Sequence, residues 1–585
     1  MILDAIRSPD DLKKLKPDQL QTLADETRAV LIERLSRTGG HVGSNLGVVE
    51  LTVALHYVFS SPTDKIVWDV SHQCYAHKIL TGRKAAYIDP AHFRDVTGFT
   101  NPAESEHDFF KIGHTATSVS LAMGLARGRD AAGGRENIIA VIGDGALGGG
   151  EAYEGLNSAG EYSGNLIIIV NDNDQSVAEN HGGLYKCLRA LRETGGKSEK
   201  NLFRGLNLDY RYLDDGHDVL ALTALFESVR DIDHPIVLHI RTTKGKGLPY
   251  AEADRENWHS GSPFRIEDGS PKNGRPVYDT TVHDSLIALL QRDKTAVILT
   301  AGTPRALGFV GEERDALEKA GRFVDVGIAE ENAMAMSGGL ARYGAAAVFG
   351  VYAPFLQRAY DQLSHDVCLN SSPATILVLL PGAYGMKSDT HLGLCDIQML
   401  AHIPNLVYLA PAYKEEYLQM LRYACTQKKH PTAIRVPVRF CECGTPDTTD
   451  YAVLNRAHVL RKGSGTAIIA VGAMVHMALD AAEACEHDGG KPVTVINPRF
   501  LTGVDETLLH ALKKDHRLVI TLEDGELDGG YGQRIASFYG PDEMRVINFG
   551  ISKAFHSDFD TAALLEANGM SVSNLIKIIR NQEEL

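Results

Sequence analysis

The sequence predicts an α/β protein with three doubly wound, mainly parallel sheets. Its length of 585 residues is the first observation, because a single hydrophobic core stops growing at roughly 250–300 residues. The second is that apolar runs rich in β-branched residues alternate with Ala/Gly/Leu-rich stretches of helical period, as in parallel sheets covered by helices. The third is that this alternation occurs in three successive blocks.

Each block contributes three expected strands. In the first block they are residues 65–70, 137–142 and 165–170, with a helix at about 150–159. In the second they are residues 322–326, 347–351 and 374–379, with helices around 330–343 and 354–369. In the third they are residues 466–471, 492–496 and 517–522. Such βαβ units place the carboxyl ends of neighbouring strands at one edge of the sheet.

Two turn-rich regions divide the chain. Residues 254–284 are rich in Gly, Pro and Asp, and residues 441–451 carry a second cluster of turn formers, so both are expected to be linkers. The expected domains are therefore residues 1–284, 285–444 and 445–585. The polar, Gly-containing stretch Arg192–Asn201 is expected to form a loop within the first domain.

Charge and composition exclude several classes of protein. The formal charge of −16 and the lack of a long basic run argue against binding of nucleic acid. The first residues mix charges, and no uncharged apolar stretch of about 18 residues follows, so we expect a cytoplasmic protein without a membrane anchor. Eight cysteines in a chain of this length do not form a disulfide framework.

Acidic and amide side chains follow two neighbouring expected strands. Gly143-Asp144-Gly145 comes directly after one, and Asn171-Asp172-Asn173 ends the next, so Asp144 and Asn173 should meet at the sheet edge. A carboxylate and an amide oxygen suit Mg²⁺, which keeps few protein ligands and completes its octahedron from substrate phosphates. The glycines let the backbone approach closely. The pair therefore predicts a cation site that holds a diphosphate.

These motifs resemble the signature of the thiamine-diphosphate-dependent transketolase superfamily. Further blocks, spread from about residue 20 to residue 540, resemble the 1-deoxy-D-xylulose-5-phosphate synthase family within it. They are Ser36–His41, Trp68–Gln73, His77–Gly82, Gly113–Thr117 and Phe355–Gln362. The resemblance implies a transketolase-like fold whose domains bind, in order, the diphosphate (residues 1–284) and the pyrimidine (residues 285–444), followed by a transketolase C-terminal domain (residues 445–585).

The resemblance assigns the cofactor residues by position. Asp144, Asn173 and a backbone carbonyl near Gln175 would bind Mg²⁺. The cofactor pocket would contain His72, Gly113, His114, Thr115, Asp144, Gly145, Ala146, Asn173 and Glu330. Gly113, His114 and Thr115 precede an expected helix whose free N–H groups and positive end would favour the diphosphate.

Catalytic and substrate residues follow from the same resemblance. Glu330 would share a proton with N1′ of the aminopyrimidine. His41, His72 and His391 are the further catalytic candidates, since imidazoles titrate near neutral pH and can pass protons to alkoxides. His41, His391, Tyr352 and Arg358 would contact substrate.

The implied reaction condenses pyruvate with D-glyceraldehyde 3-phosphate, with loss of CO₂, to 1-deoxy-D-xylulose 5-phosphate, a precursor of isoprenoids, thiamine and pyridoxal. A homodimer is implied as well. The sequence departs from the family where two phosphate-binding arginines are expected. Leu380–Gly385 replaces an Asp-Arg-Ala-Gly element, and Val438 stands in the place of the second Arg. Arg435, Arg439 and Lys387 are candidate replacements.

Two other functions stay open at this stage. A synthase-like paralogue or a transketolase would use another aldehyde acceptor or a ketose donor, and CO₂ release from pyruvate distinguishes it. Leu248, where the family has a cofactor-side Tyr, and a short segment between Asn173 and His217 also depart from the family. A binding or structural subunit, such as an E1-like component serving a lipoyl partner, is the second alternative. Failure to bind thiamine diphosphate would favour it.

Overall fold

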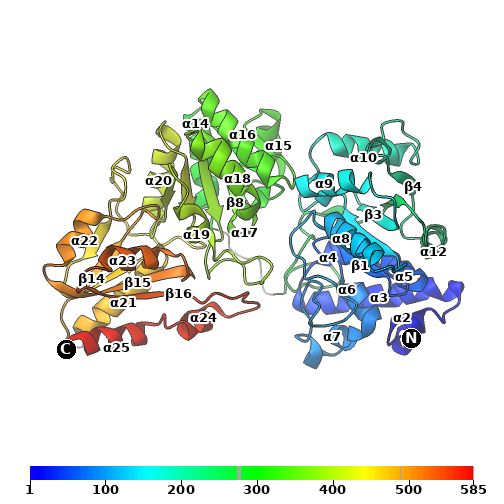
Figure 1. The fold of residues 1–585 in the computed structure, drawn as a ribbon, viewed down its shortest axis with the longest axis horizontal. Coiled ribbons are helices and arrows are strands. Elements are labelled where there is room, and N and C mark those ends of the chain that lie inside the picture. Colours follow the sequence, from blue (N-terminus) through cyan, green and yellow to red (C-terminus); the bar gives the residue numbers. More distant parts are fainter. Residues whose placement is uncertain (273–278, 488, 584–585) are drawn as a thin grey trace. The chain divides into compact units, whose positions relative to one another are not determined.

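The computed structural model describes residues 1–272, 279–487 and 489–583, without the side chain of residue 583. The chain divides into two compact units. The first contains residues 1–277 and 327–329, and the second contains residues 278–326 and 330–585. Part of the expected linker at 254–284, residues 273–278, lies outside the described residues. The units are described one at a time (Figure 1).

The first unit is built on one parallel sheet of order β1-β2-β3-β5-β4. Its strands are β1 Lys65–Trp68, β2 Ile138–Gly143, β3 Leu166–Asp172, β4 Asp209–Leu213 and β5 Pro235–Arg241. Its helices are α1 Ile2–Ala5, α2 Pro9–Leu12, α3 Pro17–Thr38, α4 Val42–Leu46, α5 Val49–Val58, α6 Tyr75–Lys78, η1 Ile79–Arg83, α7 Ala85–Ile88, η2 Pro90–His92, α8 Ser118–Ala131, η3 Ala146–Gly148, α9 Gly150–Ala159, α10 Gly183–Glu193, α11 Leu202–Gly205, α12 Val219–Glu227 and α13 Pro249–Ala253.

Alternate residues of each central strand enter different cores. Ile139 and Val141 of β2 pack with α3, α5 and α12, whereas Ala140 and Ile142 pack with α8, α9 and α10. The strands are therefore apolar on both faces, which explains why they read as continuous apolar runs rather than as an alternating pattern. Burial on both faces fixes the strand register and with it the positions of the strand ends.

The second unit contains two sheets. The first has the order β10-β11-β9-β8-β6-β7 and is parallel. Its strands are β6 Val297–Thr300, β7 Phe323–Asp325, β8 Ala347–Tyr352, β9 Thr375–Leu379, β10 Val407–Leu409 and β11 Thr432–Arg435. The second has the order β12-β14-β13-β15-β16 and is parallel except for β12. Its strands are β12 His458–Arg461, β13 Gly465–Ala470, β14 Thr494–Asn497, β15 His516–Glu526 and β16 Arg545–Ile551.

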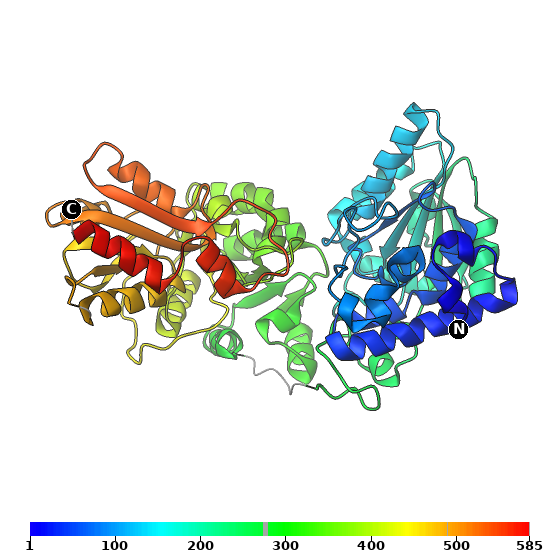
Figure 2. The same cartoon turned by 90° about the horizontal axis from the view of Figure 1, so that it is seen from below.

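Helices surround both sheets of this unit. They are α14 Thr281–Arg292, η4 Pro304–Leu307, α15 Gly311–Lys319, α16 Glu330–Tyr343, α17 Ala353–Leu356, η5 Gln357–Ala359, α18 Tyr360–Gln362, η6 Leu363–Leu369, α19 Asp396–Ala401, α20 Lys414–Thr426, α21 Met474–His487, α22 Glu506–Leu512, α23 Tyr531–Tyr539, α24 Thr561–Ala567 and α25 Val572–Glu583. The C-terminal helix α25 packs along α21 (Figures 1 and 2). One apolar cluster includes Ile376 and Tyr408 from the first sheet with Ile469 and Val519 from the second, so the two sheets share a core.

The predicted fold class, three mainly parallel α/β sheets, is confirmed. One local expectation holds in part. Residues 194–201 lie outside helices and strands, whereas Arg192 and Glu193 belong to α10, where Arg192 pairs with Asp172. Another expectation was wrong. Residues 254–272 are not a free linker, because Gly261 pairs with Gly40 and Phe264 is buried in the core of the first unit. No helix among the described residues is long and apolar enough to cross a lipid bilayer.

Candidate active site

Polar residues gather at the carboxyl edge of the first sheet, as predicted. Strands β1, β2 and β3 are neighbours, and they are followed directly by Asp69, Asp144 and Asn173. Gly143 of β2 lies opposite Asn171 of β3. The helix that joins these two strands is α9, so they form the expected βαβ unit.

Asp144 is a buried carboxyl group, with 1% of the residue exposed. Its Oδ2 accepts hydrogen bonds from the backbone N–H of Gln175 at 3.0 Å and from Nδ2 of Asn180 at 2.6 Å. Burial, together with the nearby charge of Asp172, raises the pKa of Asp144 to about 8. A carboxylate at this depth needs a positive partner, so its surroundings fit a bound cation.

Asn173 supplies a second oxygen beside this carboxyl group. Its Oδ1 is buried and accepts no hydrogen bond from any residue that the structure describes. Gly145 lies against Ser176, since a Cβ atom on Gly145 would come within 2.7 Å of Ser176 Cβ. The turn after β2 therefore touches the segment after β3, and only glycine fits at position 145. The oxygen donors of Asp144 and Asn173 suit a hard cation such as Mg²⁺.

The start of helix α8 differs from the expectation. Gly113, His114 and Thr115 do precede this helix, but Asp69 already accepts hydrogen bonds from the N–H groups of Ala116 (2.9 Å) and Ser118 (3.0 Å). These two N–H groups are therefore not open to a diphosphate. Sequence reasoning missed Asp69 because its strand end lies nearly 50 residues before the helix that it caps.

Three histidines cluster in the first unit. The ring centroids of His41 and His72 are 5.0 Å apart, and those of His72 and His259 are 5.2 Å apart. Burial lowers the pKa of His41 to about 4 and that of His259 well below its usual range. Lys244 Nζ lies 3.1 Å from His259 Nδ1, and burial lowers the pKa of this lysine to about 8.

His41 and His72 thus lie together, as their shared assignment requires. His259 and Lys244 were missed. His259 falls in the turn-rich region that was interpreted as a linker, and a lone Lys beside several glycines gives no periodic signal. His259 and Lys244 reach the cluster because of the path that the folded chain takes, which the composition of their segments does not reveal.

Glu330 is the first residue of α16 in the second unit and is 4% exposed. Its Oε2 is buried and receives no hydrogen bond within the described part of the chain. The guanidinium of Arg358 lies 3.8 Å from this oxygen. Burial nevertheless raises the pKa of Glu330 to about 7. A carboxyl group that is half protonated near neutral pH can share a proton with a basic nitrogen.

Tyr352, Phe355 and His391 form a row of rings in the same unit. The centroid of Phe355 is 5.8 Å from that of Tyr352 and 5.5 Å from that of His391. Thr390 Oγ1 lies 2.8 Å from His391 Nδ1 and orients the imidazole. Tyr352 ends β8, and Arg358 lies one helical turn beyond Phe355. Of the four predicted residues of this unit, Glu330 therefore lies beside Arg358, and Tyr352 and His391 each pack against Phe355.

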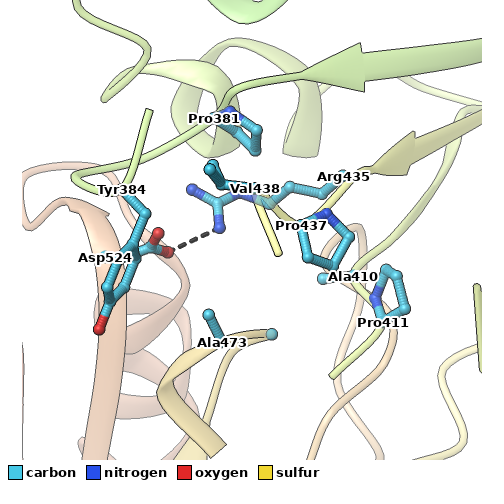
Figure 3. Close-up of a pocket in the computed structure, with 10 residues that line it drawn as sticks. Pro381, Tyr384, Ala410, Pro411, Arg435, Pro437, Val438, Ala473 and Asp524 are labelled. Atoms are coloured by element: carbon cyan, nitrogen blue, oxygen red, sulfur yellow. Dashed lines mark hydrogen bonds and ion pairs between the residues drawn. The ribbon is translucent and has the colours of Figure 1, made fainter. Parts of the chain in front are cut away.

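A small pocket opens where the two sheets of the second unit meet (Figure 3). Pro381, Tyr384, Pro437 and Val438 line it together with Arg435 and Asp524. Arg435 is not available to bind a phosphate. Its Nη1 donates to Asp524 Oδ1 at 2.6 Å, its Nε donates to Asp396 Oδ2 at 2.7 Å, and it is 5% exposed. Of the three candidate replacements for the missing arginines, only Arg439 and Lys387 are exposed.

Comparisons with known proteins cover almost the whole chain. The family model described as 1-deoxy-D-xylulose-5-phosphate synthase matches residues 3–199. The pyrimidine binding domain and the C-terminal domain of transketolase match residues 276–440 and 455–574. The solved structure of transketolase from Leishmania mexicana covers 97% of this chain and 97% of its own at 15% identity, with a TM-score of 0.44.

Curated relatives are much more similar. 1-Deoxy-D-xylulose-5-phosphate synthase 1 of Geobacter sulfurreducens is 37% identical over 95% of this chain and 93% of its own length. Synthase 2 of the same organism is 38% identical over 99% of each chain. The 1-deoxy-D-xylulose-5-phosphate synthase of Desulforudis audaxviator is 37% identical over 100% of this chain and 98% of its own.

Proposed function

Because the chain belongs to the 1-deoxy-D-xylulose-5-phosphate synthase family, we propose that it condenses pyruvate with D-glyceraldehyde 3-phosphate to 1-deoxy-D-xylulose 5-phosphate and CO₂. The observation that carries the proposal is the identity of 37% to relatives of this name over 95% and 100% of the chain. The enzyme is then a transferase of the transketolase type, which depends on thiamine diphosphate and Mg²⁺.

The first unit would hold the metal and the diphosphate. Mg²⁺ would bind the carboxylate of Asp144, Oδ1 of Asn173 and the backbone carbonyl of Gln175. The buried position of Asp144 and the unsatisfied Oδ1 of Asn173 support this assignment. Gly145 and Ala146 would lie beside the diphosphate in the turn after β2, with His72, Gly113, His114 and Thr115 around it. The N–H groups that Asp69 occupies take no part.

Glu330 would protonate and deprotonate N1′ of the aminopyrimidine. Thiamine diphosphate, when bound, supplies the electron sink that lets pyruvate lose CO₂. The protein's own contribution is a carboxyl group whose pKa of about 7 lets it hold or release that proton near neutral pH. Burial also excludes water from this proton. Its Oε2, which receives no hydrogen bond from the described residues, is the acceptor that a ring nitrogen would meet.

Three histidines would move protons on the substrates. Burial lowers the pKa of His41 to about 4, so at pH 7 it is a neutral imidazole that would hydrogen-bond a substrate oxygen and hold a proton only transiently. His72 lies beside it, with its Nε2 2.9 Å from Ser44 Oγ. His391 is oriented by Thr390 and packs on Phe355, so it presents a fixed edge to an acceptor aldehyde. Tyr352 and Arg358 would contact the same substrate.

An acceptor without a phosphate is the second candidate. One observation favours it, because Arg435 is neutralised by Asp396 and Asp524, and Val438 lines the pocket at one of the positions where an Arg was expected. A pocket of this kind offers little grip on a phosphate dianion. The protein would then be a synthase-like paralogue that transfers the same two-carbon unit to another aldehyde.

The acceptor test uses the enzyme with pyruvate, thiamine diphosphate and Mg²⁺. CO₂ release is measured with no acceptor, with D-glyceraldehyde 3-phosphate and with D-glyceraldehyde, and each product is identified by mass. The proposal expects the highest kcat/KM with the phosphorylated aldehyde and a deoxypentulose phosphate as product. A higher kcat/KM with the unphosphorylated aldehyde would favour the paralogue. No CO₂ release with either would overturn both.

A homodimer and a cytoplasmic location complete the proposal. The homodimer is the assembly that the sequence resemblance to the synthase family implies. Light scattering of the purified protein should give twice the mass of one 63.6 kDa chain. A monomer with full activity would contradict the assembly without affecting the reaction.

A further inference from the structure

The segment that follows β3 turns back onto Asp144. Ser176 N–H donates to Ala178 O at 3.0 Å, which closes a tight turn, and Lys244 Nζ donates to Ser176 O at 2.5 Å. The chain reverses direction at this turn, so the backbone N–H of Gln175 and the side-chain Nδ2 of Asn180 both donate to the same oxygen, Oδ2 of Asp144. The turn thus brings Asn180 to the carboxyl group from seven residues beyond Asn173.

The side chain of Asn180 has two different neighbours. Its Nδ2 donates to Asp144 Oδ2 at 2.6 Å. Its Oδ1 is buried and has no hydrogen-bond partner in the described ranges of the chain. The amide orientation follows from the chemistry, because a carboxylate oxygen requires a donor and the reversed amide would place two oxygens together. The free oxygen therefore points away from the carboxyl group.

Asn173 Oδ1 is likewise buried without a hydrogen-bond partner among the described residues, so the segment after β3 carries two such amide oxygens. An unsatisfied buried polar group is costly to the folded state. Two such groups in the segment that hydrogen-bonds the buried carboxylate of Asp144 suit an electropositive ligand, a cation with its bound water. Mg²⁺ keeps several of its waters when it binds to protein, and each water is a donor.

We propose that Asn180 is a positioning residue of the cation site. Its amide nitrogen fixes Asp144 Oδ2 and leaves Asp144 Oδ1 to face the cation, while its Oδ1 accepts a hydrogen bond from a water on that cation. The inference rests on the proposed function only for the identity of the cation, Mg²⁺. Groups in this role orient the direct ligands, and their loss typically lowers metal affinity 10–100-fold.

The test measures Mg²⁺ affinity directly. Mg²⁺ is titrated by calorimetry into the metal-free full-length protein in the presence of saturating thiamine diphosphate. Asn180→Ala is expected to raise the Kd for Mg²⁺ by about 10–100-fold. Glu179→Ala is the matched control, because Glu179 is the exposed neighbour in the same segment. Its Kd should stay within two-fold of wild type.

A second readout separates positioning from folding. The thermal unfolding midpoint is recorded without Mg²⁺, where a purely structural residue would lower it and a positioning residue would not. If Asn180→Ala does not fold, Asn180→Ser replaces it, since the shorter hydroxyl does not reach Asp144. An unchanged Mg²⁺ affinity in the folded variant overturns the inference alone. A wild-type protein that binds no Mg²⁺ overturns the cation site and the inference together.

The experiments can also exclude the proposed reaction without excluding the role of Asn180. In that case Mg²⁺ binds tightly to wild type and weakly to Asn180→Ala, yet pyruvate and D-glyceraldehyde 3-phosphate give no deoxypentulose phosphate. That combination supports the role of Asn180 and removes the substrate assignment.

Discussion

Glu330, the proposed catalytic acid, lies in an unusual environment. It is the first residue of α16, and acidic residues are common at helix starts. Glu330 is nevertheless buried, and one of its carboxylate oxygens has no hydrogen-bond partner among the described residues. A residue that served only to favour the helix start would be exposed to solvent. The raised pKa, about 7, is the consequence of burial and the property that proton transfer needs.

Glu330→Gln should therefore abolish most of the activity. The amide cannot exchange a proton with the cofactor ring, so CO₂ release from pyruvate should fall by about 10²–10⁴-fold. Binding of thiamine diphosphate and Mg²⁺, measured by calorimetry, should change by less than a few-fold. A variant that keeps more than a tenth of the wild-type rate would exclude the assigned role.

Individual residues also mark the limit of sequence reasoning. Asp144 and Asn173 could be identified because each follows a strongly apolar strand, whereas Glu330 was identified through the resemblance to the family. Asn180, Asp69, His259 and Lys244 could not, because each reaches the site through a turn or a long connection whose path has no periodic signature. Arg435 was one of three candidate phosphate ligands, but its partners Asp396 and Asp524, which lie 39 and 89 residues away in the sequence, occupy its guanidinium.

Asp69 links two elements of the first unit, β1 and α8. It follows β1, is fully buried, and accepts hydrogen bonds from the N–H groups of Ala116, which precedes α8, and of Ser118, the first residue of α8. Such a cap stabilises a helix by about 0.5–2 kcal/mol. It also fixes the segment of Gly113, His114 and Thr115, which lies between the strand end and the helix.

Asp69→Ala should lower the free energy of unfolding by about 1–2 kcal/mol, because two N–H groups lose their acceptor. Urea denaturation followed by fluorescence measures the change. Asp69→Asn keeps one acceptor oxygen and should lose less than the Ala variant. Equal stability of Asp69→Ala and wild type would show that the cap contributes nothing.

A buried pair of histidines connects α5 with α6. His56 Nε2 and His77 Nδ1 are 2.9 Å apart, and His77 Nε2 lies 2.8 Å from Asp108 Oδ1, with Arg83 on the same carboxylate. Burial lowers the pKa of His77 to about 4 and that of His56 well below its usual range. The usual value in an unfolded chain is about 6.5.

The unfolded chain therefore binds protons at these histidines at a higher pH than the folded chain does. As the pH falls from about 6.5 towards 4, the pair should reduce the free energy of unfolding by roughly 1–3 kcal/mol. Comparing urea midpoints of wild type and His77→Gln at pH 7.5 and pH 5 isolates this contribution, because other groups titrate in both proteins. The variant should lose less stability on acidification. Parallel pH curves would contradict the prediction.

At the scale of the whole molecule, a buried ion network connects the two sheets of the second unit. Arg435 ends β11 in one sheet, and Asp524 lies in β15 of the other. Asp396, at the start of α19, holds the opposite side of the guanidinium and accepts a hydrogen bond from Tyr408 OH. Figure 3 shows the guanidinium directed at Asp524 across the pocket.

Arg435→Met should destabilise the second unit by about 3–5 kcal/mol, because it leaves two buried carboxylates without their cation. Arg439→Met is the matched control, since Arg439 is exposed four residues later and should change stability by less than about 0.5 kcal/mol. Both are measured by urea denaturation. If the two variants were equally stable, the network would not hold the sheets together.

More of the fold than of the candidate site could be predicted from the sequence. Strands buried on both faces read as continuous apolar runs, so the sheets of all three blocks were found, and helix α16 was expected at the residues that form it. Short or partly exposed strands such as β4, β12 and β16 have no such run and were missed. The boundaries at residues 284 and 444 remain predictions.

The central claim is a decarboxylative transfer of two carbons from pyruvate to an aldehyde. The measurement that tests it most directly uses pyruvate labelled with ¹³C at C2 and C3, together with unlabelled D-glyceraldehyde 3-phosphate, thiamine diphosphate and Mg²⁺. We expect a deoxypentulose phosphate with both labelled carbons and CO₂ without label. A product without label, or labelled pyruvate that remains intact while a ketose phosphate donor is cleaved, would contradict it.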